Sequence, residues 1–162
     1  MPNNNYFRRC RSPLGELLIT GNNVTINGLY LPGHRHYAGI AAGLPETDQR
    51  FAEVVRQLDE YFAGKRQQFE LAVEQPGTEF QQAVWRELAA IPYGGRLSYG
   101  ELSRRLQRPK AYRAVGSANG ANQVAIVIPC HRVLASNGAL SGYAGGPEAK
   151  AWLLAHEAKF SR

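Results

Sequence analysis

Apolar stretches separated by turn signals open the chain. Over residues 6–31 the turn signals stand at Pro13–Gly15 and Gly21–Asn23, and short apolar runs bounded in this way are typical of strands joined by tight turns. We therefore predict an antiparallel meander of three strands. The following stretch, Pro32–Pro45, is rich in Pro, Gly and His, and we predict a loop there.

A helical period replaces this pattern after the loop. Apolar side chains recur at helical spacing over residues 47–63, which predicts an amphipathic helix. The segment FELAV, residues 69–73, predicts a short strand. Glu74–Gly77 contains Pro and Gly and is the predicted linker, so we expect one small domain over residues 1–77 and a second over residues 78–162.

Helix-capping residues organise the second part. Capping-box patterns begin at Thr78 and at Ser98, each with Glu or Gln three residues on. They predict helices over about residues 79–91 and 99–106. A further helix is predicted over residues 110–119, after a tight turn. Two short helices joined by a turn of three or four residues form the helix-turn-helix pattern.

The chain ends with an apolar run, a loop and a helix. The run VAIVIPC, residues 124–130, predicts a strand that stops at Pro129, and Asn137–Gly138 predicts a hairpin turn. A Gly-rich loop precedes a predicted helix over residues 147–159. The fold class we predict is α+β, with an N-terminal antiparallel sheet and helix and a mostly helical C-terminal domain that resembles a winged helix.

Composition narrows the classes of protein to which the chain can belong. Of its 162 residues 44% are hydrophobic and 20% are charged, and no apolar stretch has the length of a membrane span or forms a signal-peptide core. We expect a cytoplasmic protein, associated with the nucleoid if it is bacterial. Its two cysteines, Cys10 and Cys130, are expected to be reduced there. For Cys10 we expect the ordinary fate of a small buried side chain.

The positive charge is confined to the second part. Residues 1–77 hold 8 Lys or Arg against 8 Asp or Glu, and residues 78–162 hold 11 against 5, so the net charge of +6 arises there. A cluster lies on or beside the helix-turn-helix, at Arg104, Arg105, Arg108, Lys110 and Arg113. This cluster favours binding to a polyanion such as DNA, although a solvated basic face would have the same composition.

The second helix of this unit, KAYRAVGSANG, is rich in small residues. Proteins that read base edges carry several Asn, Gln or Arg side chains on such a helix. The composition therefore favours shallow, non-specific contact with DNA. The alternative is that the small residues allow the helices to pack closely.

The adjacent pair Cys130 and His131 carries the candidate chemistry. A thiolate is a soft, strong nucleophile, and it forms near neutral pH when a base or a positive charge stands nearby. Glu157, in the apolar segment WLLAHE, is the acidic residue that could orient the histidine. Adjacent Cys and His also occur by coincidence, and on a strand their side chains point apart, but Pro129 argues against a strand here.

The segment Pro129–Val133, PCHRV, resembles the signature of the O6-alkylguanine-DNA alkyltransferases. The resemblance covers residues 78–159, with a weaker match at Tyr61–Gly64. Further matches stand at family-like separations, at Ser98–Gly100, Arg113–Gly116, Asn122, Ser136–Gly146 and Trp152–Glu157. The resemblance implies DNA repair in which an alkyl group passes directly from O6-alkylguanine to Cys130, once per protein molecule.

The resemblance also implies roles for individual residues. His131 would take the thiol proton through a water, Glu157 would hold the histidine, and Asn122 would brace the turn. Tyr99 would hydrogen-bond the purine and protonate the leaving guanine, while Arg113 would enter the stack where the base flips out of the minor groove. The implied pocket walls are Tyr143, Ala144, Gly145 and Ser136. The implied DNA contacts are Arg104, Arg105, Arg108, Lys110, Tyr112, Arg113, Ala114 and Ser117. Taken singly, each of these residues also has a purely structural explanation, and their joint spacing around PCHRV favours the functional one.

Several positions depart from the family pattern. Gln123 replaces a proline found in many relatives, so the brace around Asn122 is expected to be less rigid. Tyr112 replaces a small residue before Arg113, and Ala144 replaces a hydroxyl residue found in some relatives. We expect these changes to affect substrate preference and DNA affinity rather than activity.

The expected partner is double-stranded DNA that contains alkylated guanine. We expect a monomer that uses no cofactor and binds no metal, because Cys10, His34 and His36 lack the second cysteine of a zinc site. O4-alkylthymine as a second substrate and cooperative binding along DNA stay open.

Three other functions stay open on the residues alone. A cysteine hydrolase would use Cys130 and His131 to form and hydrolyse a thioester, but it leaves the basic helices without a role. A protein that binds alkylated bases and recruits repair factors would have no need of the cysteine. A transcription regulator would need base-reading side chains that the second helix lacks.

Overall fold

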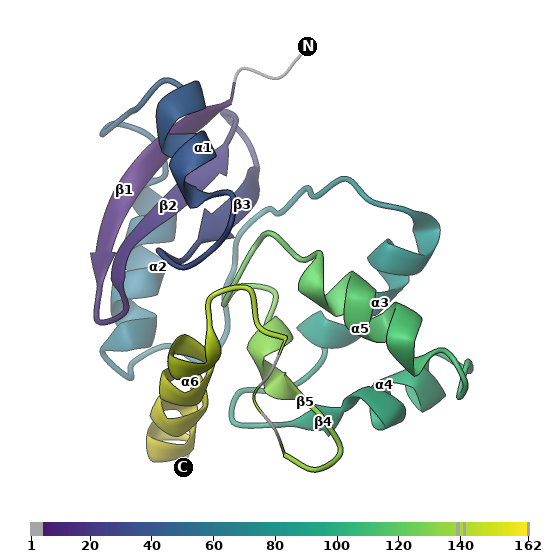
Figure 1. The fold of residues 1–162 in the computed structure, drawn as a ribbon. Coiled ribbons are helices and arrows are strands. Elements are labelled where there is room, and N and C mark those ends of the chain that lie inside the picture. The colour runs from purple at the N-terminus through teal and green to yellow at the C-terminus, as the bar shows by residue number, and fades with distance from the viewer. Residues whose placement is uncertain (1–4, 139, 141, 162) are drawn as a thin grey trace.

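The computed structural model describes residues 5–138, 140 and 142–161 of the chain. Its class is α+β, as predicted (Figure 1). A three-strand antiparallel sheet with helices lies on one side of the molecule, and a largely helical unit lies on the other. The C-terminal helix runs beside the junction between them.

The sheet is the predicted meander. Strands β1 (Tyr6–Ser12), β2 (Gly15–Gly21) and β3 (Ile26–Tyr30) are hydrogen-bonded in the order β1-β2-β3. The outer edge of β3 is also occupied, because Leu29 N–H donates to Gln123 O at 2.8 Å. The C-terminal part of the chain therefore covers the edge of the sheet that β3 would otherwise leave unpaired.

Each face of the sheet is covered by a helix. Helix α1 (Tyr37–Gly43) lies within the stretch that we predicted to be a loop, so that prediction is wrong. Its side chain Ile40, with Leu44 just after it, packs against the small cluster Phe7, Leu18 and Tyr30 on one face. The Pro-, Gly- and His-rich composition hid a helix that is stabilised by covering this face.

Helix α2 (Ala52–Phe62) covers the opposite face and begins five residues later than predicted. Phe51 precedes it with φ of 66°, a left-handed conformation that stops the helix from extending toward Thr47. The segment FELAV is not a strand, since only Val73 forms an isolated bridge, with Ile26.

The helical part has the predicted helix-turn-helix. Helices α3 (Glu79–Ala89) and α4 (Tyr99–Arg105) both begin at complete capping boxes, which confirms the sequence prediction. Helix α5 (Tyr112–Gly120) starts two residues later than predicted. Trp85 of α3 fixes it by donating its indole N–H to Ala118 O at 2.9 Å.

The apolar run before Cys130 is a series of turns, so the predicted strand is wrong. Ile126 has φ of 71°, and its neighbours are held by local hydrogen bonds such as Ile128 N–H to Val124 O at 3.0 Å. A short 3-10 turn, Cys130–Arg132, follows.

The last elements return to the helical part. Strand β5 (Val133–Leu134) pairs in parallel with β4 (Leu97–Ser98), and helix α6 (Pro147–Phe160) closes the described chain. The turn predicted at Asn137–Gly138 is present, with Gly138 at φ of 82°. No strand follows it within residues 140 and 142–161, so a hairpin is not formed by the residues that the structure describes. Within the part of the chain that the structure describes, no helix has the length and apolar character to cross a membrane.

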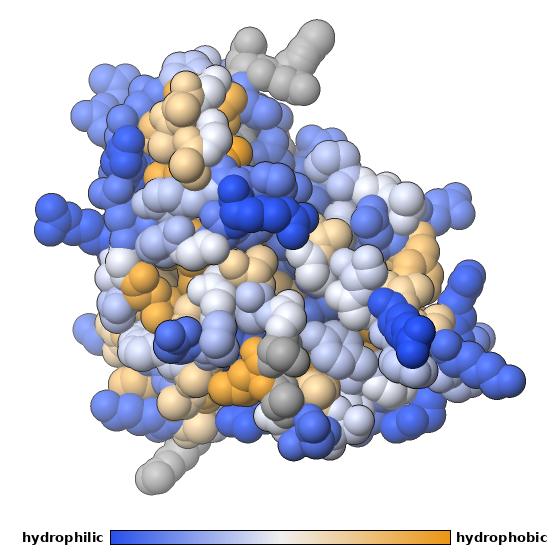
Figure 2. Space-filling model, in the orientation of Figure 1, coloured by the Kyte–Doolittle hydropathy of each residue, from blue (hydrophilic) through white to orange (hydrophobic). Residues whose placement is uncertain are grey.

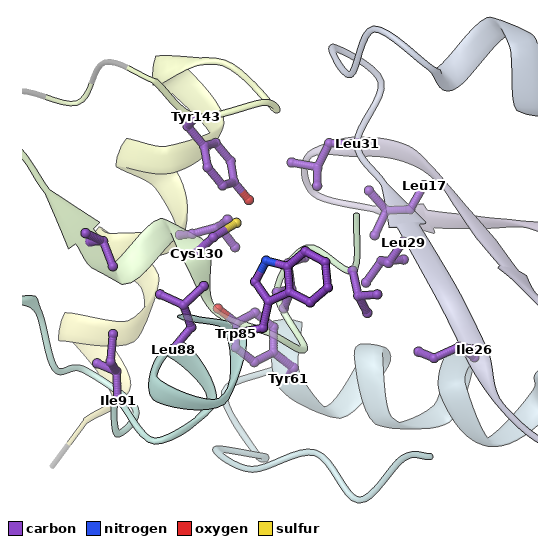
Figure 3. Packing of buried hydrophobic residues seen from close by; sticks show 14 of the residues in the cluster. Leu17, Ile26, Leu29, Leu31, Tyr61, Trp85, Leu88, Ile91, Cys130 and Tyr143 are labelled. Atoms are coloured by element: carbon purple, nitrogen blue, oxygen red, sulfur yellow. The ribbon is translucent and has the colours of Figure 1, made fainter. Parts of the chain in front are cut away.

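The main hydrophobic core runs continuously through both parts (Figure 3). Leu17 and Leu29 of the sheet lie on one side of Trp85, and Leu88 and Cys130 lie on the other. The candidate nucleophile is therefore built into the core of the molecule.

Candidate active site

Cys130 stands at the start of the 3-10 turn and is 4% exposed. Figure 3 shows the hydroxyl of Tyr143 pointing toward its sulfur. Burial raises the pKa of the thiol, although a hydrogen bond from Asn122 and the positive charge of Lys150 work in the opposite direction. Burial thus disfavours the thiolate that we expected beside the histidine, while Asn122 and Lys150 favour it.

His131 is fully buried and is bonded to Glu157. Its Nε2 lies 2.8 Å from Glu157 Oε2, so Nε2 carries the proton in the neutral ring. Burial lowers the pKa of His131 more than the carboxylate raises it, which keeps the ring neutral. The other ring nitrogen, Nδ1, is buried and has no hydrogen-bond partner among the described residues. The histidine thus offers a free acceptor in a water-poor site.

Glu157 of α6 accepts hydrogen bonds from several groups at once. Arg132 Nε and Nη2 donate to its two oxygens at 2.8 and 2.9 Å, and Tyr61 Oη donates to Oε2 at 2.6 Å. Burial alone would raise the pKa of the carboxyl, but the hydrogen bonds from His131 and Arg132 outweigh it and lower that pKa well below its usual range. Glu157 is therefore a permanent buried anion.

Two of these partners were not among the predicted site residues. Arg132 is 5% exposed and donates its remaining Nη1 to Ile91 O at 2.7 Å, so its charge is held for Glu157. Tyr61 comes from α2, in the N-terminal part of the chain. Its place in the short match Tyr61–Gly64 was a signal, but the sequence did not indicate that its hydroxyl reaches α6.

Lys150 was also missed. It is 0% exposed and donates Nζ to Val133 O at 2.6 Å. Its ammonium lies 6.0 Å from the centroid of the Tyr143 ring. Burial lowers the pKa of Lys150, and the nearby Cys130 offsets only part of that shift. No pattern in the sequence separates this lysine from an exposed one on a helix.

Asn122 lies where the predicted brace requires it. Its Nδ2 donates to Ile128 O at 2.9 Å, and its Oδ1 accepts from Val124 N–H at 3.1 Å. Both bonds close the turns that lead to Cys130. The side chain of Gln123, in place of the family proline, accepts a hydrogen bond from Tyr30 Oη at 2.8 Å.

Two tyrosines predicted to meet the substrate lie near the cysteine. Tyr143 is buried and its hydroxyl has no partner among the described residues. Tyr99 is half-buried, and burial and the nearby Cys130 raise its pKa. Ala144 and Gly145 continue the loop after Tyr143 and are half-buried. Ser136 is exposed on the turn that follows β5.

The residues predicted to contact DNA share one property, which is that all are exposed on or between α4 and α5. They are Arg104, Arg105, Arg108, Lys110, Tyr112, Arg113, Ala114 and Ser117. Figure 2 shows hydrophilic side chains projecting from this side of the molecule. None of the five cations lies within ion-pair distance of a carboxylate among the residues that the structure describes. Their charge is available to a ligand.

Tyr112 and Arg113 form a pair at the start of α5. Tyr112 is 51% exposed, and the guanidinium of Arg113 lies 6.0 Å from the centroid of its ring. The bulky residue that departs from the family pattern thus stands beside the predicted intercalating arginine.

The residues considered for zinc lie elsewhere. Cys10 is buried on β1, while His34 and His36 stand on the loop before α1 with ring centroids 5.2 Å apart. Burial lowers the pKa of His34 to about 4, helped by the charges of His36 and Arg35. In the described ranges no three metal-ligating side chains gather.

Comparison with known proteins gives matches along both parts of the chain. Residues 79–159 match the family described as "6-O-methylguanine DNA methyltransferase, DNA binding domain". Residues 5–75 match "6-O-methylguanine DNA methyltransferase, ribonuclease-like domain". The first match contains every predicted site residue.

Individual relatives extend over nearly the whole chain. The chain is 42% identical to a methylated-DNA–protein-cysteine methyltransferase of Methanosarcina mazei, over 92% of this chain and 94% of the relative. It is 43% identical to the constitutive enzyme of that name from Bacillus subtilis, over 93% of each. A crystal structure of Mycobacterium tuberculosis OGT in complex with DNA superposes with a TM-score of 0.89 at 38% identity, covering 96% of this chain and 94% of that one.

Proposed function

The chain belongs to the 6-O-methylguanine DNA methyltransferase family and is a DNA-repair enzyme of the methylated-DNA–protein-cysteine methyltransferase class, and we propose that Cys130 accepts the alkyl group. The observation that carries this assignment is the state of His131. One ring nitrogen is bonded to a permanent carboxylate. The other is a buried acceptor, in the residue next to the thiol, that has no partner among the residues that the structure describes.

The proposed first step is proton transfer from the thiol. The Cys130 proton moves to Nδ1 of His131 through a bridging water, and Glu157 stabilises the imidazolium that results. Because Glu157 is also held by Arg132 and Tyr61, it does not need to move when the charge develops. Lys150 and Asn122 oppose the effect of burial on the sulfur, so the anion is tolerated once formed.

The second step is displacement at the alkyl carbon. The sulfur forms an S–C bond as the bond from that carbon to guanine O6 breaks. Tyr99 Oη donates a proton to the purine, so that the leaving group is neutral guanine within the DNA, and the proton held by His131 then passes to the Tyr99 oxygen. Tyr143, Ala144, Gly145 and Ser136 are the proposed walls of the pocket that holds the flipped base.

Single turnover follows from the product. An S-alkyl cysteine is a thioether, which has no carbonyl for water to attack and a poor leaving group. Cys10, the other cysteine, is buried on β1, and we propose that it takes no part. The reaction is stoichiometric and needs no cofactor.

DNA binding is proposed for the exposed side of α4 and α5. The small residues Ala114 and Ser117 would approach the minor groove, the flanking cations would neutralise phosphates, and Arg113 would fill the space of the flipped base. Binding affinity measured against salt tests this. Arg108→Gln is expected to make the slope of log affinity against log salt shallower by about 1, because one phosphate contact is lost. Gln68→Ala, on the N-terminal part, is expected to leave the slope unchanged.

Intact mass after incubation with an O6-methylguanine oligonucleotide tests the central proposal. The expected result is a gain of one methyl per protein, on the peptide that contains Cys130. Binding of the oligonucleotide without a mass gain would instead support a lesion-binding protein. Product release beyond one equivalent would support a hydrolase. An O4-methylthymine oligonucleotide, run in parallel, tests the second substrate.

The remaining proposals concern organisation. We propose that residues 78–162 carry the chemistry and DNA binding, that residues 1–77 support them, and that the protein acts as a cytoplasmic monomer. Sedimentation of the protein with and without DNA tests the oligomeric state, including cooperative assembly along the duplex.

A further inference from the structure

Gln75 lies in the segment that the sequence presents as a linker, yet it is 8% exposed. Its side-chain amide bridges two consecutive residues at the start of the turns that lead to Cys130. Nε2 donates to Asn122 Oδ1 at 3.0 Å, and Oε1 accepts from Gln123 N–H at 2.6 Å. The backbone is fixed as well, because Gln75 O accepts from Gln82 Nε2 at 2.6 Å. The segment is thus held on both sides.

The direction of these bonds is determined at one end. A backbone N–H can only donate, so the N–H of Gln123 requires the oxygen of Gln75 to face it. The amide nitrogen of Gln75 must then face Asn122, and it finds Oδ1. Val124 N–H donates to the same Oδ1 at 3.1 Å, and the Nδ2 group of Asn122 is left for Ile128 O, two residues before the cysteine.

The same N–H donor exists only because residue 123 is not a proline. Proline has no backbone N–H, so the departure from the family pattern at Gln123 creates a partly buried donor that needs a partner. Gln75 provides that partner. The brace that we expected to be weakened by Gln123 is rebuilt through a side chain from the N-terminal part of the chain.

We propose that Gln75 is a positioning residue that, together with Val124 N–H, holds the Asn122 amide in the orientation in which its N–H groups face the Cys130 turn. It acts through Asn122 and does not touch the substrate. This inference rests on the proposed function only for its importance to methyl transfer, since the orientation itself is a property of the free protein.

The matched test is Gln75→Glu, which keeps the size of the side chain. One carboxylate oxygen still accepts from Gln123 N–H, but the other faces Asn122 Oδ1, and two acceptors repel. The Asn122 side chain is then pushed away from residue 75, because Val124 N–H still holds its oxygen on that side, and its amide moves out of place at the Cys130 turn. Gln75→Met removes both hydrogen bonds without adding charge, and Gln68→Glu adds the same charge at an exposed position of the N-terminal part.

The readout is alkylation of Cys130 by iodoacetamide across a pH series without DNA, followed on the Cys130 peptide. The titratable groups that face the thiol, namely Tyr99, Tyr143, Lys150 and His131, are unchanged in all variants. We expect the pH at which alkylation reaches half its maximal rate to rise by about one unit in Gln75→Glu. At any pH below that midpoint, this corresponds to about a tenfold loss of thiolate. A smaller rise is expected in Gln75→Met, and no change in Gln68→Glu.

Equal midpoints in wild type and Gln75→Glu, with only a loss of stability, would overturn the proposal. If both Gln75 variants fail to fold, proton exchange of the side-chain amides in the wild-type protein decides. We expect the Gln75 and Asn122 amides to exchange much more slowly than that of exposed Gln68, and equal rates would also overturn it. Methyl uptake by the wild type is measured separately, so failure of the proposed function would be recognised independently.

Discussion

Cys10 and Cys130 are both buried, at 5% and 4% exposure, and burial raises the pKa of each thiol. The groups around the two thiols shift the pKa in opposite directions. The carboxylate of Asp59 raises the pKa of Cys10 further, with a small opposing effect from Arg8. Around Cys130 the charge of Lys150 and the amide of Asn122 lower the pKa against burial. Because the two thiols are almost equally exposed, the polar groups around each sulfur are what separate the proposed acceptor, Cys130, from Cys10.

The largest expected effect comes from removing each sulfur in turn. Cys130→Ala is expected to abolish methyl uptake, because no other group near His131 can accept the methyl. Cys10→Ala is expected to keep the full rate and to lose about 1 kcal/mol of unfolding free energy from the small cavity. Intact mass and chemical denaturation measure the two outcomes. A methyl gain on Cys130→Ala would remove the contrast between the sites.

The next effect concerns the anion behind His131. Glu157→Gln leaves Arg132 buried without its charge partner, which is expected to cost about 3 to 5 kcal/mol of stability. It also removes the group that stabilises the imidazolium, so methyl transfer is expected to slow by about a hundredfold or more. Single-turnover kinetics and urea denaturation check both.

Tyr61→Phe is the matched control for that change. It removes one hydrogen bond to the carboxylate and keeps the charge, so we expect a stability loss of about 1.5 to 3 kcal/mol and a rate within a few-fold of wild type. A rate as low as that of Glu157→Gln would mean that orientation of the carboxylate, rather than its charge, limits the reaction.

A smaller effect is expected from Lys150→Met. Loss of the ammonium removes an influence that lowers the pKa of Cys130, so alkylation of that thiol by iodoacetamide should need a higher pH, by about one unit. Cys10, on the far sheet, serves as the internal control in the same digest, because its alkylation profile should not move. A shift at both cysteines would indicate general loosening of the fold.

The smallest expected effect is a gradual loss of stability in acid. The folded-state pKa of His131 is lowered, so the unfolded chain binds the proton more readily, and stability falls as the pH drops below about 6.5. The pKa of Glu157 is also lowered, so its contribution is lost as the pH falls below about 4.3 toward the folded-state value. Denaturation by urea across this range measures both.

His34 has to be separated from His131 in that experiment. Its pKa is lowered to about 4, so His34 also makes the protein lose stability as the pH falls below about 6.5. His34→Asn removes this contribution on the N-terminal part, and the slope that remains between pH 6.5 and 5 should belong to His131. A flat profile in His34→Asn would contradict a neutral, buried His131.

Elements defined by local hydrogen bonds could be predicted from the sequence. The capping boxes at Thr78 and Ser98 involve residues three positions apart, so their helices begin where predicted. Helix α1 and the start of α2 could not, because they depend on the sheet face that α1 covers and on the left-handed backbone at Phe51. The apolar run before Cys130 has strand composition, but its backbone is bonded across turns.

Only some members of the candidate site could be predicted from the sequence. Cys130, His131 and Glu157 were indicated by their residue types and by the resemblance to the family. Arg132, Tyr61 and Lys150 were missed, because they join the site through contacts between distant parts of the chain that leave no local pattern. Gln75 was taken for part of a linker because its partners stand 47 and 48 positions later in the chain. Interactions over such separations leave no periodic signal.

The closed edge of β3 has a consequence for any attempt to shorten this protein. A fragment beginning at Thr78 would lose the strand that binds the backbone of residues 123–125. It would also lose the tyrosine donor to Glu157. Such a fragment would carry every reacting group and still lack the frame that aligns them. Miniaturising this enzyme therefore requires new donors to be engineered onto the helices.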